Sequence, residues 1–68
     1  MNLGKAIQQA RKARGWTQKQ LAQKVGLHRV TIADIEGSLT QGHHSGDKIA
    51  EALGIKLSEL YAQAEELE

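Results

Sequence analysis

An apolar rhythm that is interrupted once constrains the fold of this chain more than any other feature. The segment 21–37, LAQKVGLHRVTIADIEG, places apolar side chains at helical spacing, stops at Gly26 and resumes three residues later. Glycine adopts a positive φ without a Cβ clash, so it ends a helix readily. The pattern predicts two helices, over about 18–25 and 29–36, joined by a tight turn that Leu27 anchors.

The residues before this pair predict another helix, over 3–14, because their apolar side chains recur on one face. Its expected inward stripe is Leu3, Ile7, Ala10 and Ala13. Its charged side chains, Arg11 among them, are expected to point outward. Gly15 is expected to follow it in a left-handed conformation.

Trp16 and Thr17 connect this helix to the interrupted pair. A lone tryptophan more often packs in a core than stacks on a base, so Trp16 is expected inside. The Thr17 hydroxyl can accept a hydrogen bond from a free amide at the start of helix 18–25, so Thr17 is the expected N-cap. The residues expected to be buried in the pair are Leu21, Ala22, Val25, Ile32 and Ile35.

The second half of the chain predicts a loop and two more helices. Residues 38–45, SLTQGHHS, have the composition of a loop. A fourth helix is expected to start between His43 and Asp47 and to end at Gly54. Ser58 is the expected cap of a last helix, whose apolar side is Leu57, Leu60, Tyr61, Ala64 and Leu67. The prediction is an all-α, five-helix fold that forms a single domain over residues 1–68.

The amino-acid composition excludes several classes of protein and site. There is no cysteine, which removes disulfides and thiolate metal ligands. No apolar run approaches the roughly 18–20 residues that cross a bilayer. Residues 1–15 also lack the apolar segment of a signal peptide. We therefore expect a cytoplasmic protein that has no membrane partner.

Charge is distributed unevenly along the chain, although the net charge is only +1. Residues 1–33 contain seven lysines and arginines and no carboxylate. Residues 34–68 contain eight carboxylates and two lysines. A stretch this long without a carboxylate favours contact with a polyanion such as nucleic acid.

The histidines and the polar loop do not indicate a metal site or an enzyme. His43 and His44 are adjacent, so on a helix they would not face each other, and His28 lies far along the chain. A triad of Ser45, His44 and Asp47 would lack an oxyanion hole and a substrate pocket. We expect no metal, no cofactor and no catalytic residue.

Residues 18–37 resemble the helix-turn-helix of the phage lambda repressor and Cro family, also called the xenobiotic-response-element family. All seven fixed positions of the motif match, and they are Leu21, Ala22, Val25, Gly26, Leu27, Ile32 and Ile35. The flanking segments GWTQ and IAEALGIKLSELY agree as well, so the resemblance extends over about residues 3–61. It implies a lambda-repressor-like fold and a double-stranded DNA partner.

The resemblance also implies which side chains read base edges, because helix 29–36 would enter the major groove. These positions are Arg29, Val30, Ala33 and Asp34. Arg29 suits guanine, to which arginine binds bidentately, and Val30 suits a thymine methyl group. Asp34 either accepts a hydrogen bond from cytosine N4 or orients Arg29.

A second set is expected on the phosphate backbone. Its members are Thr17, Gln18, Lys19, His28, Thr31, Arg11 and Arg14. Gln18 corresponds to the family residue that both binds phosphate and braces the recognition helix. Lys24 is a further candidate for neutralising phosphate charge.

The chain departs from the family after the motif. The segment SLTQGHHSGDK stands where the family usually has a basic, proline-containing loop and a leucine-rich helix start. His43 and Gly46 occupy positions where apolar residues are expected, so the start of the fourth helix should be shorter or differently packed. Main-chain amides of Gln41, Gly42 or His43 are the remaining candidates for phosphate contacts there.

The resemblance predicts a transcriptional regulator of the repressor, Cro or controller type. Such proteins usually act as homodimers, whose two modules read a pseudo-palindromic operator with half-sites about 34 Å apart. The alternative is an antitoxin-like or other protein-interaction module on the same fold, because a fold does not determine function. The acidic last segment, SELYAQAEELE, is the candidate partner face in that case.

Overall fold

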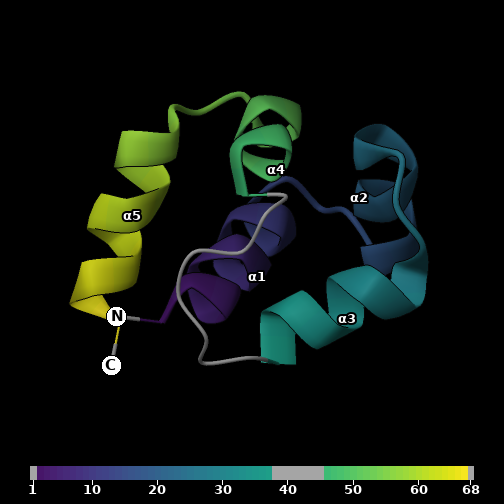
Figure 1. Cartoon of the computed structure of the whole chain (residues 1–68), viewed down its shortest axis with the longest axis horizontal. Helices are drawn as coiled ribbons and strands as arrows, with labels where there is room; N and C mark the ends of the chain where they lie inside the picture. The colour runs from purple at the N-terminus through teal and green to yellow at the C-terminus, as the bar shows by residue number, and fades with distance from the viewer. Residues whose placement is uncertain (1, 38–45, 68) are drawn as a thin grey trace.

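The computed structural model describes residues 2–37 and 46–67, which form five α-helices and no strand (Figure 1). The helices are α1 (Leu3–Ala13), α2 (Gln18–Val25), α3 (Arg29–Gly37), α4 (Gly46–Leu53) and α5 (Leu57–Glu66). In Figure 1, α1 runs through the middle of the molecule, with α5 on one side and the pair α2 and α3 on the other. The predicted all-α, five-helix fold is confirmed.

One hydrophobic core joins the five helices. Every helix contributes at least one of the largest fully buried side chains, which are Leu3, Ile7, Leu21, Ile32, Ile49 and Leu60. Burying an aliphatic side chain of this size stabilises the fold by roughly 1.5–3 kcal/mol. Because Leu21 of α2 and the two isoleucines of α3, Ile32 and Ile35, belong to this same core, the core holds the predicted recognition helix against the rest of the chain.

The turn between α2 and α3 has the predicted geometry. Gly26 has a φ of +83° and a ψ of +28°, in the left-handed region. The carbonyl of Ala22 accepts hydrogen bonds from the amides of both Gly26, at 2.8 Å, and Leu27, at 2.9 Å. The Leu27 side chain packs on the core. These contacts close the end of α2 and direct the chain into α3.

Side-chain caps define the starts of α1 and α2. The side chain of Asn2 accepts a hydrogen bond from the Lys5 amide, and the Asn2 amide donates to the Ala64 carbonyl of α5. Thr17 caps α2 as predicted, because its hydroxyl accepts from the Gln20 amide. The Gln20 side chain in turn accepts from the Thr17 amide at 2.7 Å, which completes a capping box.

Two expectations for α1 are wrong. Ala13 is exposed, whereas Arg11 is buried and points inward. Arg11 follows Ile7 by four residues, so it continues the buried face of α1 over the next helical turn. Ala13, the last residue of α1, lies on the other side of that face.

The start of α5 differs from the prediction, whereas the start of α4 agrees with it. Ser58 is not the cap of α5, because the helix begins at Leu57 and its N-cap is Lys56, with extended backbone angles. The Glu59 carboxylate accepts a hydrogen bond from the backbone amide of Lys56 at 3.4 Å. This contact stands in place of the cap that was expected from Ser58. Helix α4 begins at Gly46, within the predicted interval, and residues 43–45 lie outside the described residues.

Trp16 and Val25 are only partly buried, although each packs against the core. Gly46, at a position where the family usually has an apolar residue, is buried, and a Cβ there would meet Leu57 at 3.6 Å. The start of α4 therefore packs closely against the start of α5 without a large side chain.

Substituting Gly26 with alanine should lower the free energy of unfolding by about 1–2 kcal/mol. The reason is backbone strain alone, because φ is +83° and no atom lies within 4 Å of the added Cβ. Urea unfolding followed by circular dichroism measures the change. Gly37→Ala is the matched control, since Gly37 also has free space around a Cβ but no positive φ. Equal effects of the two substitutions would contradict the assigned role of Gly26.

Candidate nucleic-acid interface

Helix α3 has two faces with opposite properties. Its inward side chains, Ile32, Ile35 and Glu36, are buried. On the outward side, Arg29 and Asp34 are exposed, and Val30 is 59% exposed. Val30 is the only large hydrophobic residue that is exposed in the described part of the chain. A single exposed apolar side chain is ordinary on a protein surface, so Val30 matters here only because it shares the outward side of α3 with Arg29 and Asp34.

The predicted base-reading residues therefore share one helix and one region of the surface. Ala33, the fourth of them, and Thr31 are half-buried beside the exposed side chains. His28 is exposed immediately before α3, and its carbonyl accepts the Ile32 amide. The first turn of α3 contains no acidic residue that would repel phosphate.

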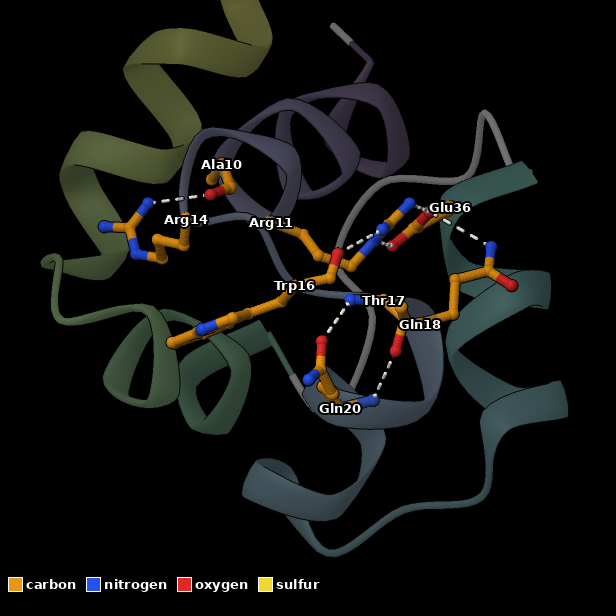
Figure 2. A network of polar contacts seen from close by, with 8 residues as sticks. All are labelled: Ala10, Arg11, Arg14, Trp16, Thr17, Gln18, Gln20 and Glu36. Atoms are coloured by element: carbon orange, nitrogen blue, oxygen red, sulfur yellow. Dashed lines mark hydrogen bonds and ion pairs between the residues drawn. The ribbon is translucent and has the colours of Figure 1, made fainter.

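A buried ion pair supports α3 from behind, as Figure 2 shows. Arg11 of α1 donates from Nε to one carboxylate oxygen of Glu36 at 2.7 Å and from Nη2 to the other at 3.1 Å. Its third contact runs from Nη1 to the carbonyl of Trp16 at 2.6 Å. The bidentate geometry is the strongest form of arginine–carboxylate pairing.

Gln18 completes this network from α2. Its side-chain amide donates to Glu36 at 3.2 Å, so the Glu36 carboxylate is bound from two helices at once (Figure 2). No buried side-chain nitrogen or oxygen of the described residues lacks a hydrogen-bond partner. The network joins α1, the turn at Trp16, α2 and α3, and thereby sets the angle at which α3 presents its outward face.

The roles of Arg11 and Glu36 were not predicted from the sequence, although a signal was present. Arg11 lies four residues after the buried Ile7, and Glu36 lies four residues after the buried Ile32. Opposite charges on the buried faces of two helices are best explained by mutual pairing, because an isolated buried charge is very unfavourable. Gln18 was expected to brace the recognition helix, and its bond to Glu36 provides such a brace.

Not all predicted phosphate-contacting residues lie near α3. The Arg11 guanidinium is directed inward by Glu36 and Trp16, so the expected outward position is wrong. Arg14 is exposed, but it donates to the Ala10 carbonyl, and Figure 2 shows it pointing away from Gln18 and α3. Thr17 and Lys19 are exposed at the start of α2.

The charge asymmetry of the sequence is also an asymmetry in space. Helix α5 carries the carboxylates of Glu59, Glu65 and Glu66, all exposed, and lies across the molecule from α2 and α3 (Figure 1). On α3, the Glu36 charge is neutralised by Arg11, so Asp34 is its one exposed carboxylate. A polyanion is therefore attracted to the α2 and α3 side rather than to the α5 side.

The remaining expectations concern metals and membranes. Among residues 2–37 and 46–67, no group of three or more His, Cys, Asp or Glu side chains is placed to hold a metal ion. Residues 38–45, which include the loop amides expected at phosphate, lie outside the described residues. None of the described helices has the length and apolar character needed to cross a membrane.

Comparison with known proteins agrees with this geometry. A family model described as helix-turn-helix matches residues 7–36, which span most of α1, all of α2 and α3 up to Glu36. Residues 7–36 are thus a helix-turn-helix segment of the family that includes phage lambda repressor and Cro, as the resemblance predicted.

Three curated relatives match 58 residues, or 84% of this chain. Multiprotein-bridging factor 1 of Debaryomyces hansenii is 45% identical over that length, and the match covers 39% of that protein. The endothelial differentiation-related factor 1 homolog of Gallus gallus and endothelial differentiation-related factor 1 of Homo sapiens are each 41% identical, again over 39% of their length. The chain spans about two fifths of the length of the curated relatives it matches.

Substituting Glu36 with alanine should lower the free energy of unfolding by about 3–5 kcal/mol, because it leaves the Arg11 guanidinium buried without a counter-charge. The two side chains are 9% and 2% exposed, so solvent screens the loss very little. Thermal unfolding followed by circular dichroism measures the change.

Two further variants test the origin of this effect. Gln18→Ala should cost about 1 kcal/mol, since it removes one hydrogen bond and leaves the ion pair intact. A double variant, Arg11→Met with Glu36→Leu, should be more stable than Glu36→Ala, because it removes both charges and keeps the volume filled. If the double variant were less stable than Glu36→Ala, the uncompensated charge of Arg11 would not be the cause of the instability of Glu36→Ala.

Proposed function

We propose that this chain binds double-stranded DNA in a sequence-specific way, with α3 in the major groove, and thereby regulates transcription. The observation that carries the proposal is the outward face of α3. Arg29, Val30 and Asp34 project from a helix that the Glu36 network holds in place. A helix of this width fits the major groove, which is about 12 Å wide.

Each outward side chain has a chemical role in this proposal. Arg29 donates to O6 and N7 of guanine, while Val30 and Ala33 offer apolar contact to a thymine methyl group. Arg11 with Glu36 is the only ion pair within the described ranges, so Arg29 and Asp34 do not pair with each other there. This supports the role of Asp34 as an acceptor for cytosine N4 over that of a partner for Arg29.

The phosphate contacts are proposed at the starts of α2 and α3. Thr17, Gln18 and Lys19 lie where α2 begins, and His28 and Thr31 lie where α3 begins. Free main-chain amides at helix N-termini favour phosphate oxygens. Gln18 uses one amide proton for Glu36 and keeps the second for DNA. Arg11 is not proposed as a phosphate contact because it is buried. Arg14 is not proposed because its side chain points away from α3.

A homodimer reading a pseudo-palindromic operator is the proposed active form, because one module of this size makes few base contacts. A second candidate function is that the chain binds DNA and another protein together, and regulates transcription through that protein. The name of the fungal relative, multiprotein-bridging factor, favours it, as does the exposed acidic face of α5 opposite α3. The two candidates share the same use of α3.

Selection of bound duplexes from a random library, followed by titration at two salt concentrations, tests the proposal. We expect an enriched site, and a pseudo-palindromic one if the chain acts as a dimer. Arg29→Ala should lower discrimination at one base pair by about 1–3 kcal/mol while leaving non-specific binding nearly unchanged. Gln18→Ala should weaken specific and non-specific binding together, since phosphate carries no sequence information.

Lys5→Ala is the control, because Lys5 is an exposed cation of α1 that belongs to neither contact set. Equal losses on all sequences for Arg29→Ala would remove its role as a base reader. An enriched site without dyad symmetry would favour the bridging candidate over the homodimer. Absence of any enriched site would overturn sequence-specific binding.

A further inference from the structure

Two neighbouring hollows lie on the side of α2 that does not face α3. The first has a volume of about 350 Å³ and is lined by Trp16, Gln20, Gln23 and Lys24. The second has a volume of about 500 Å³ and is lined by Lys24, Val25, Lys48, Glu51 and Ala52. Since Lys24 borders both, they form one continuous surface across α2 and α4, which we call the α2–α4 surface.

The α2–α4 surface is separate from the proposed DNA-reading face. None of the outward residues of α3 lines either hollow. Figure 2 shows the Trp16 side chain extending away from Gln18, Glu36 and α3. A molecule bound there would leave α3 accessible to DNA.

The shape of the surface suits a polypeptide better than a small molecule. Small-molecule sites enclose most of the surface of their ligand. Both hollows are open to solvent, and together they extend from the α1–α2 turn to the outer side of α4. An extended or helical segment of another protein would lie along them.

The chemistry of the surface selects an acidic partner. Lys24 and Lys48 are exposed cations, and Glu51 is the one carboxylate of the lining. The half-buried Val25 and Ala52 also line the second hollow and form its apolar floor. A segment that places carboxylates on both sides of an apolar side chain complements this arrangement.

Lys24 contacts Trp16 in the chain alone. Its Nζ lies 4.6 Å from the centre of the Trp16 ring, a cation–π contact. Lys24 also lines both hollows, so this contact places its ammonium group within the α2–α4 surface. A contact that favours one position of the side chain lowers the conformational entropy lost on binding.

We propose that the α2–α4 surface binds an acidic segment of another protein, in which carboxylates flank an apolar side chain. A nucleic-acid backbone fits this surface less well, because it would leave the apolar floor uncovered and would lie against Glu51. This interaction is additional to DNA binding and does not depend on it.

The test uses the whole chain and a labelled synthetic peptide, Asp-Asp-Leu-Glu-Glu-Leu-Asp-Asp, followed by fluorescence anisotropy. We expect saturable binding and a change in the emission of Trp16, the single tryptophan of the chain. Lys48→Glu should weaken binding about tenfold, because it replaces an attraction with a repulsion and leaves the contact between Lys24 and Trp16 intact.

Lys5→Glu is the matched control, since it makes the same charge change at an exposed position of α1 outside the surface. It should leave the peptide affinity unchanged. A second control peptide, Asn-Asn-Leu-Gln-Gln-Leu-Asn-Asn, should not bind. Equal weakening by Lys5→Glu, binding of the neutral peptide, or no binding of the acidic peptide would each overturn the proposal.

Two measurements separate this proposal from DNA binding. Arg29→Ala should leave the peptide affinity unchanged, and Lys48→Glu should leave the affinity for a selected duplex unchanged. If Lys48→Glu weakened duplex and peptide binding equally, the surface would be part of the DNA interface and the proposal would be wrong. Failure of DNA binding in every variant would affect only the proposed function.

Discussion

The buried pair of Arg11 and Glu36 is the interaction on which the arrangement of α3 depends. Two charges removed from water are tolerated only when each is paired and its remaining hydrogen-bonding groups are satisfied. Here the bidentate contact, the Trp16 carbonyl and the Gln18 amide meet that requirement. Because these partners come from α1, α2 and the turn between them, any rotation of α3 would break several bonds at once. The hydrophobic core holds α3 against the chain, and the network fixes its direction.

This arrangement separates the side chains that stabilise the fold from those proposed to read DNA, within one short helix. The inward side of α3 supplies Ile32, Ile35 and Glu36 to the core and the network. The outward side supplies Arg29, Val30 and Asp34, which no described contact uses for folding. These outward side chains can therefore be exchanged with little loss of stability. The same separation holds for the molecule as a whole, with the acidic α5 placed across from α2 and α3 (Figure 1).

Much of the fold followed from local sequence signals, because those signals act within one helical turn. Gly26 ends α2 through its own φ, and Thr17 caps α2 through an amide three residues away. The expected cap at Ser58 was wrong for a related reason. Glu59 satisfies the free amide from inside the helix, so Lys56 takes the cap position although its side chain cannot accept a hydrogen bond.

The sequence by itself determined the helix-turn-helix, its apolar positions and the candidates for the outward face of α3. Periodicity and turn chemistry are short-range properties, so they can be read from neighbouring residues. Only the tertiary structure decided that Arg11 is a core partner of Glu36 and that Arg14 points away from α3. It also decided that Lys24 lies over Trp16. The physical reason is that a charged side chain is directed by whichever partner the packing brings within reach, and that partner can lie 25 residues away.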